Sequence, residues 1–253
     1  MKIIISPAKS LDFDTELPTQ EYSIPAFLEE TQKIHKVLVK KKPKALMDLM
    51  DISTQLAELN WERNQKFSLP FTPENARQAM YAFNGDVYAG LDAYTLPEDK
   101  LEEVQEKLRI LSGLYGILRP LDLIQPYRLE MGTTLKIGRR KNLYDFWKTT
   151  LTSALNEEIE DGEILVNLAS NEYYSALDAK KLKAEIITPV FKDWKNDKLR
   201  VLSFFAKKAR GSMVRYLIES GANTLEEIKG FAEDGYQYSR EHTLKDNQPV
   251  FVR

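Results

Sequence analysis

The chain has 253 residues, 43% of them hydrophobic, and a formal net charge of −2. This length can supply the core of one large domain or two small ones, and no stretch approaches the ~18 uncharged apolar residues that a membrane span requires. The absence of cysteine excludes disulfides, thiolate metal sites and cysteine nucleophiles, and His35 and His242 lack the spacing of metal ligands or of a catalytic triad. Because Met1 to Ile5 also lacks a signal-peptide pattern, we expect a soluble protein that is not secreted.

The first third of the chain predicts one strand followed by helices. The β-branched run Lys2 to Ile5 predicts a strand, which ends in a polar loop at Ser6 to Ser10. Residues 11–24 lack periodicity and predict a surface loop. Apolar spacing and helix-start residues predict the helices, which are expected from Pro25 to Leu38, from Pro43 to Trp61 with a break near Asp51 to Thr54, and from Ala76 to Phe83 after the cap Thr72-Pro73-Glu74.

The middle of the chain predicts two further helices. Val87 to Leu91 is expected to be a short strand or an exposed loop. Thr95-Leu96-Pro97-Glu98 has the pattern of a capping box. The helix after it is expected to bury Leu101, Val104, Leu108 and Leu111. A second helix is expected to bury Leu143, Phe146, Trp147 and Leu151.

The last third predicts most of the strands. These are expected at residues 164–168, 185–191, 199–205 and 250–252. A helix is expected from Ala206 to Glu219, and Thr224 to Glu227 has a second capping-box pattern. There is no repeat, low-complexity tract or flexible linker. The sequence therefore predicts one domain over residues 1–253, of mixed α and β structure, with a mixed sheet flanked by helices.

The segment from Lys192 to Arg215 is strongly basic, with eight Lys or Arg against two acids. Within it, Ser203 to Gly211 predicts a strand that runs into a helix, with Lys207, Lys208 and Arg210 near the helix start. Cations are unfavourable at that end of the helix dipole unless an anion is near, and free amides there favour phosphate. The pattern therefore predicts an anion site. The alternative is that these cations point into solvent.

The segment from Leu111 to Gly132 holds an unusual density of glycine, proline, arginine and tyrosine. Gly113, Tyr115 and Gly116 form a pattern similar to the hairpin of a helix-hairpin-helix motif, whose amides bind DNA phosphates. The glycines are one residue further apart than is usual, and Pro120 shortens the second helix. Two turns follow, one at Arg119-Pro120 and one at Pro126 to Arg128. The alternative is a buried corner in which the arginines pair with carboxylates.

Polar residues also follow two of the predicted strands. Ser6 and Lys9 follow the first, and the loop after residues 164–168 holds Asn167, Ser170, Asn171 and Glu172. If the strand ends converge, these residues would line one pocket together with Arg119, Arg128 and Glu130. A lysine beside carboxylates can have a perturbed pKa and act as a base or nucleophile. The candidates for proton transfer are Lys9, Glu130 and Glu172.

Five segments together resemble the YaaA family (UPF0246, DUF328) of bacterial proteins. They are SPAKSLDF at 6–13, FTPENARQAMYAFNGDVYAGL at 71–91, LSGLYGILRPLDLIQPYRLEMG at 111–132, NLASNEY at 167–173 and FFAKKARGSMVRY at 204–216. The resemblance covers essentially the whole chain. It implies a role in resistance to peroxide stress in the cytoplasm, where the family is linked to limiting damage driven by intracellular iron. It also implies a single α/β domain of unusual topology.

The resemblance also implies binding of double-stranded DNA through a helix-hairpin-helix-like element and a positively charged cleft. Carried over by position, the element is the segment around Leu111 to Leu118, including Gly113, Tyr115 and Gly116. The cleft would draw on the cations Lys9, Arg119, Arg128, Lys207, Lys208 and Arg210. The resemblance implies no cofactor and no assigned reaction, and a monomer is favoured.

Three functions are therefore compared. The first is a DNA-binding stress protein that contacts phosphates without reading bases. The second is an enzyme acting on a nucleotide or nucleobase, with the same cations holding a phosphate. The third is iron sequestration by carboxylates alone, which is disfavoured because most acids lie on helix faces beside lysines, as solvated i,i+4 partners.

Overall fold

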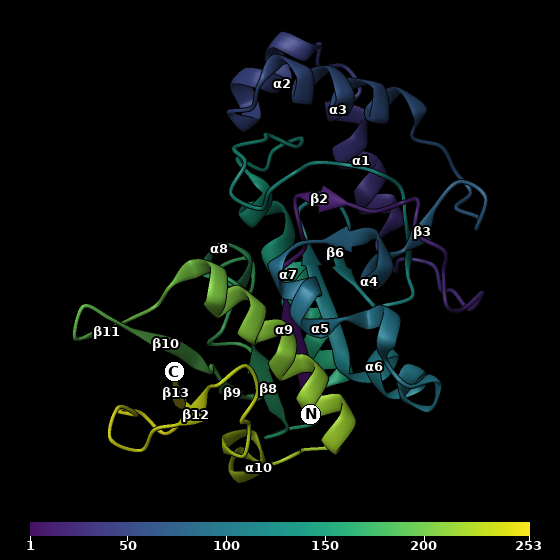
Figure 1. Ribbon diagram of the computed structural model, residues 1–253. Helices are drawn as coiled ribbons and strands as arrows, with labels where there is room; N and C mark the ends of the chain where they lie inside the picture. Colours follow the sequence, from purple (N-terminus) through teal and green to yellow (C-terminus); the bar gives the residue numbers. More distant parts are fainter.

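A five-stranded sheet lies at the centre of the computed structural model, which describes residues 1–253 (Figure 1). Its strands lie in the order β6-β5-β1-β8-β9. The pairs of β1 with β5, β1 with β8 and β8 with β9 are parallel, whereas β6 is antiparallel to β5. The bounds are β1 Lys2–Ile5, β5 Leu108–Ser112, β6 Gly116–Leu118, β8 Ile164–Asn167 and β9 Glu185–Ile187.

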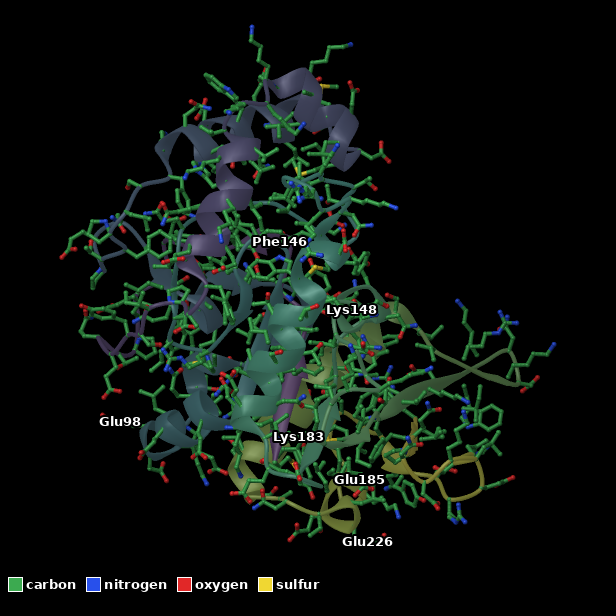
Figure 2. All side chains as sticks on the ribbon, turned by 180° about the vertical axis from the view of Figure 1, so that it is seen from behind. Glu98, Phe146, Lys148, Lys183, Glu185 and Glu226 are labelled. Carbon is green, nitrogen blue, oxygen red and sulfur yellow. The ribbon has the colours of Figure 1, made fainter.

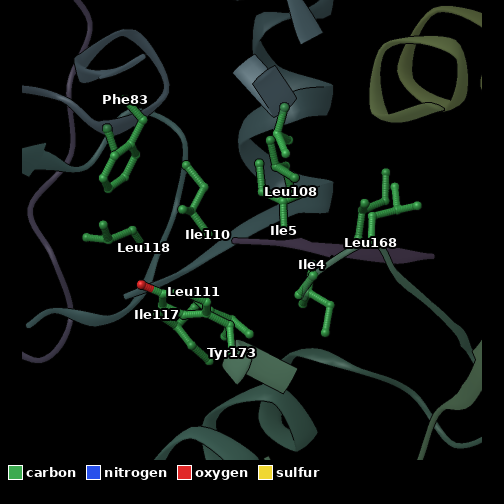
Figure 3. Close-up of a cluster of buried hydrophobic side chains, with 14 of the residues drawn as sticks. Ile4, Ile5, Phe83, Leu108, Ile110, Leu111, Ile117, Leu118, Leu168 and Tyr173 are labelled. Atoms are coloured by element: carbon green, nitrogen blue, oxygen red, sulfur yellow. The ribbon is translucent and has the colours of Figure 1, made fainter. Parts of the chain in front are cut away.

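Strand β1 is buried on both faces, as the central strand of a parallel sheet should be. Ile3 pairs with Leu108 of β5 on one side and with Val166 of β8 on the other. Figure 3 shows Ile4 and Ile5 pointing to opposite sides of the strand, each among buried apolar side chains. The continuous apolar run that predicted this strand is thus explained by burial on two sides.

Three smaller sheets complete the β structure. One has four strands in the order β11-β10-β13-β12, and the other two are the pairs β2 with β4 and β3 with β7. In the four-stranded sheet, β10 and β11 form a hairpin that projects from the body of the molecule (Figure 1). The bounds are β2 Ser10–Leu11, β3 Arg77–Gln78, β4 Phe83–Asn84, β7 Leu123–Ile124, β10 Val190–Lys195, β11 Lys198–Arg200, β12 Gln237–Tyr238 and β13 Val250–Val252.

Helices cover both faces of the central sheet. In Figure 1, α5 and α9 cross in front of β1, and the view from behind shows α7, which carries Phe146 and Lys148, along the opposite face (Figure 2). None of the helices has the combined length and apolar character needed to cross a bilayer. The bounds are α1 Leu28–Leu38, α2 Pro43–Met50, α3 Thr54–Lys66, α4 Ala79–Ala82, α5 Asp86–Leu91, α6 Leu101–Lys107, α7 Leu143–Glu158, α8 Asn171–Tyr174, α9 Ser203–Ser220 and α10 Leu225–Lys229.

One continuous core joins the two larger sheets. Ile3 of the central sheet and Phe191 and Phe251 of the four-stranded sheet belong to the same cluster of buried apolar side chains. A chain with one shared core behaves as one domain. The predicted single domain of mixed α and β structure is therefore confirmed.

Several predicted boundaries are wrong, and tertiary packing explains each difference. The helix predicted to run to Leu111 ends at Lys107, because Leu108–Ser112 pairs with β1 as a strand. Val87 to Leu91 is helical, within α5, and α9 begins at Ser203, so the predicted strand at 199–205 is cut short. Only a short helix, α4, lies in the range predicted for residues 76–83.

The two capping-box predictions have different outcomes. Thr224 caps α10 with the reciprocal bonds to Glu227, which confirms the second prediction. The first is wrong, because the Thr95 hydroxyl donates to the Asp92 carboxylate at 2.7 Å. Pro97, not Thr95, lies at the N-cap of the short 3-10 turn that follows.

The segment predicted to resemble a helix-hairpin-helix is a buried β-hairpin formed by β5 and β6. Ser112 pairs with Gly116, and residues 113–115 form the turn. The amides of Leu114 and Tyr115 donate to Ser112 Oγ, and the Trp147 indole donates to the Gly113 carbonyl at 2.9 Å. These groups are used inside the fold, so this hairpin does not present free amides at the surface. The apolar side chains of β5 and β6 favour strand pairing over the predicted helices because they complete the central sheet.

The crossing of α5 and α9 is unusually close because glycine lies on both helices. A Cβ atom on Gly211 would lie 1.8 Å from the Val87 carbonyl oxygen, and one on Gly90 would lie 2.1 Å from the Lys208 carbonyl oxygen. Both clashes are with backbone, which cannot rotate away. The two glycines therefore set the distance between the helices, and with it the position of the side chains that α9 presents towards the end of β1.

We predict that Gly211→Ala destabilises the protein by about 1–3 kcal/mol, because the added methyl group forces the helices apart. Urea denaturation of the variant and the parent protein would measure the difference. In an unconstrained helix interior the same change stabilises by up to about 1 kcal/mol. A gain in stability would therefore contradict the close crossing.

Candidate functional site

A pocket of about 450 Å³ lies where β1 and β8 end. The loop Ser6 to Ser10 follows β1, and Leu168 and Ser170 follow β8. Both strands are parallel, so their carboxyl ends meet at the same edge of the sheet, which is where ligands bind in open α/β sheets. The predicted convergence of the two polar loops is thus present in the structure.

Hydrogen bonds join the two loops to each other and to α5. The Ser170 amide donates to Ser6 Oγ at 2.9 Å, and the Tyr88 hydroxyl donates to the Ser6 carbonyl at 3.1 Å. Burial raises the pKa of Tyr88 and of Tyr173, the two tyrosines in the lining. Both phenols therefore stay neutral at ordinary pH, and the formal charge of the pocket comes from other residues.

Six charged residues line the pocket, three of each sign. Lys9 Nζ lies 2.7 Å from Glu130 Oε2, and Lys207 Nζ lies 3.9 Å from Asp86 Oδ2. Glu172 accepts a hydrogen bond of 2.8 Å from the Gly132 amide. The lining is Lys9, Lys207, Arg210, Asp86, Glu130 and Glu172. This balance differs from the strongly positive cleft that the family resemblance implies.

Arg210 is the one charged side chain of this lining that has neither an ion pair nor a hydrogen bond. It lies on α9, one residue before Gly211, and is partly buried. Burial lowers the pKa of its guanidinium, and no neighbouring carboxylate offsets that effect. Arginine remains charged in proteins even so. A cation held partly out of water without a partner is costly unless an anion binds there.

The remaining predicted cations lie outside this pocket or at its edge. Arg128 lies behind Glu130, with 3.3 Å between Nη2 and Oε1. Lys208 pairs with Asp234 at 2.9 Å, and Arg119 pairs with Asp122 at 3.2 Å. The arginines of the segment 111–132 therefore pair with carboxylates, as the alternative interpretation of that segment expected.

The pocket brings together candidate residues that the sequence suggested for two separate sites, and its lining includes further residues. Lys9, Glu130 and Glu172, predicted for proton transfer, share the pocket with Lys207 and Arg210, predicted for anion binding. Gly113, Tyr115 and Gly116 are buried and lie apart from it. The lining also includes Ser10, Asn84, Gly85 and Asp86, which were not predicted. Within the segment 71–91, the pair Asn84-Gly85 by itself indicates only a turn or a helix end.

A lysine run was also missed. Residues 36–44, KVLVKKKPK, hold five lysines and no acid, and they lie around the end of α1 and the start of α2. Such runs are a recognised pattern of nucleic-acid-binding surfaces. Counting charge in a sliding window would have found it.

Comparison with known proteins decides the family. The family described as "Peroxide stress protein YaaA" matches residues 1–242. The chain belongs to the YaaA peroxide stress protein family. The predicted resemblance is thus confirmed, and with it a role in peroxide stress at the level of the family.

Similar relatives cover all or nearly all of this YaaA-family chain. A UPF0246 protein of Flavobacterium johnsoniae is 59% identical over 253 residues, covering 100% of both chains. A UPF0246 protein of Flavobacterium psychrophilum is 57% identical over 253 residues, again covering 100% of both. One of Hahella chejuensis is 54% identical over 241 residues, covering 94% of each.

We predict that Glu130→Gln destabilises this YaaA-family protein by about 1–3 kcal/mol. The change removes the negative charge that pairs with both Lys9 and Arg128, and the Arg128 side chain is only 15% exposed, with a buried Nε that already lacks a partner. Chemical denaturation would measure the loss. The control is Glu62→Gln, which removes an exposed pair with Lys66 and should cost under about 0.5 kcal/mol. Equal losses in the two variants would contradict the structural role of Glu130.

Proposed function

We propose that the protein acts in the peroxide stress response by binding the phosphates of double-stranded DNA. The observation that carries this proposal is the lysine run at residues 36–44. Four of its lysines are exposed, Lys36, Lys40, Lys42 and Lys44, and Lys41 is half-buried. None of the five is in an ion pair, whereas the cations around the pocket other than Arg210 have carboxylate partners. An unpaired lysine cluster on an otherwise acidic protein supports an anionic partner.

The position of the lysine run supports phosphate as that anion. Pro43 is the first residue of α2, so Lys40 to Lys42 lie directly before the helix and Lys44 lies in its first turn. The first turn of α2 holds no acid. Free amides and the positive end of the helix dipole attract anions here. The same positive end repels the lysine side chains when no anion is bound. Binding of an anion at this end of α2 would relieve that repulsion.

Helices α2 and α3 form a pair joined by three residues, Asp51 to Ser53, at the top of Figure 1. Asp51 adopts a left-handed conformation with φ of 50°, and Ser53 caps α3 by accepting a hydrogen bond from the Leu56 amide. Two helices joined by a short connection are the arrangement that the family resemblance implies for DNA contact. We therefore assign that role to α2 and α3 in place of the buried hairpin of β5 and β6.

A second exposed basic surface lies on the hairpin of β10 and β11. Lys195, Lys198 and Arg200 are exposed, Lys192 is half-buried, and none of the four is in an ion pair. These residues account for half of the cations in the basic segment 192–215. The hairpin supports additional phosphate contacts, at a distance from the helix pair in Figure 1.

We predict that replacing Lys40, Lys41, Lys42 and Lys44 together by alanine weakens binding to every duplex sequence alike. Each lysine that neutralises a phosphate contributes about −0.9 to the slope of log K against log salt concentration, so removing each such lysine should make the slope shallower by that amount. Fluorescence anisotropy with labelled duplexes of unrelated sequence, over a range of salt concentrations, measures both effects.

The matched control replaces Lys33, Lys66, Lys181 and Lys183 by alanine. These four lysines are exposed and ion-paired, so the control has the same change in net charge and leaves the lysine run intact. It should keep the parent slope. If the lysine-run variant binds DNA as the parent does, or if the control weakens binding as much, the proposed surface is wrong.

A further inference from the structure

We propose that the pocket at the ends of β1 and β8 is a binding site for a small phosphorylated molecule, with Arg210 as the residue that holds the phosphate. This site is separate from the lysine run and does not depend on DNA binding. The pocket is lined by polar residues at the ends of β1 and β8. A surface that only contacts DNA phosphates does not require these residues. A nucleotide is one such molecule, and an enzyme acting on a nucleotide would use this same site.

The size and position of the pocket suit a small molecule. Its volume of about 450 Å³ falls in the range of ordinary ligand pockets, about 300–1,000 Å³. It opens at the carboxyl edge of the parallel strands, where open α/β sheets place their ligands. The lining comes from five separate parts of the chain: residues 6–10, 84–88, 130, 168–173 and 207–210.

The charges in the pocket leave one cation free. Lys9 is neutralised by Glu130, which Arg128 also contacts, and Lys207 lies near Asp86. Arg210 has neither an ion pair nor a hydrogen bond within the protein, although burial already weakens its hydration. The guanidinium has a planar fork of donors that matches the oxygens of phosphate in a bidentate contact. An anion bound at Arg210 would therefore neutralise the one cation of the lining that has no ion-pair partner.

The surrounding groups favour a phosphorylated molecule with further polar groups over a free anion. Asn84, Ser10 and Ser170 offer neutral donors and acceptors, and Glu172 has one oxygen, Oε2, that makes no hydrogen bond within the protein. A carboxylate oxygen accepts hydrogen bonds from hydroxyl or amino groups of a ligand. The pocket thus combines a phosphate contact at α9 with acceptors on α8 for the rest of the molecule.

The close crossing of α5 and α9 holds Arg210 in place. Gly211, the next residue, contacts the backbone of α5 so closely that the helix cannot move inward, and Asn84 to Tyr88 form the facing wall. The backbone at Arg210 is therefore held beside the pocket, so that binding a ligand does not require α9 to move.

The test is isothermal titration calorimetry of the full-length protein with four probes: inorganic phosphate, pyrophosphate, AMP and adenosine. We expect at least one phosphorylated probe to bind with a Kd below about 1 mM and adenosine to bind at least about tenfold more weakly than AMP. Arg210→Gln should weaken binding of the phosphorylated probe by about tenfold or more. Arg210→Lys, which keeps the charge but removes the fork, should be intermediate.

The matched control is Arg139→Gln, which makes the same chemical change at an exposed position outside the pocket and should leave the Kd of the probe unchanged. Circular dichroism checks that each variant is folded. If Arg210→Gln does not fold, Lys207→Gln tests the same end of the pocket, and we expect it to weaken binding of the probe. The proposal is overturned if no phosphorylated probe binds, if adenosine binds as tightly as AMP, or if the folded pocket variants bind as the parent does.

The DNA measurement separates this proposal from the previous one. Arg210→Gln should leave the salt dependence of DNA binding unchanged, and the lysine-run variant should leave the Kd for the phosphorylated probe unchanged. If Arg210→Gln reduces binding of duplex DNA and of the small probe together, the pocket is part of the DNA surface and the inference of a separate small-molecule site is wrong.

Discussion

The parallel pairing of β1 with β5 and β8 is the constraint on which the rest of the structure depends. β1 is the first strand of the chain and β8 begins more than a hundred residues later, yet both end at the same edge of the sheet. Burial of the strands on both faces fixes this register, since a strand in a shifted register would lose its contacts with neighbouring apolar side chains. The polar loops after the two strands are consequently held together by Ser6 and Ser170.

The second determinant is the contact between α5 and α9. Gly90 and Gly211 let the two helices approach to a distance that no larger side chain would permit. This contact brings Arg210 from the last third of the chain against residues 84–88, beside the ends of β1 and β8. The pocket is thus the product of two packing events, one in the sheet and one between helices, and neither involves a ligand.

The distribution of ion pairs separates two kinds of cation. Those that lie beside the core and the pocket are mostly matched by carboxylates, as Lys9 is by Glu130, Lys208 by Asp234 and Arg119 by Asp122. The cations without an ion pair include Arg210 within the pocket and, at the surface, the lysines of residues 36–44 and the cations of the β10–β11 hairpin. Such an arrangement suits two anionic ligands of different size. A concave site with one free guanidinium suits a small phosphate, and exposed lysines on projecting elements suit a polyanion.

The sequence by itself determined the family, the mixed α and β class, strand β1, helices α2, α3 and α7 and the capping box at Thr224, because each depends on local residues or on a long motif. It also placed Lys9, Glu130 and Glu172 among the candidate site residues. Only the tertiary structure decided that Leu108 to Leu118 forms strands and a buried turn, since these apolar residues take the conformation that completes the sheet around β1. Likewise, the sequence does not show which acid forms an ion pair with a given lysine or arginine. Which cations are matched by acids, and that Arg210 is not, follows from distances between residues far apart in the chain.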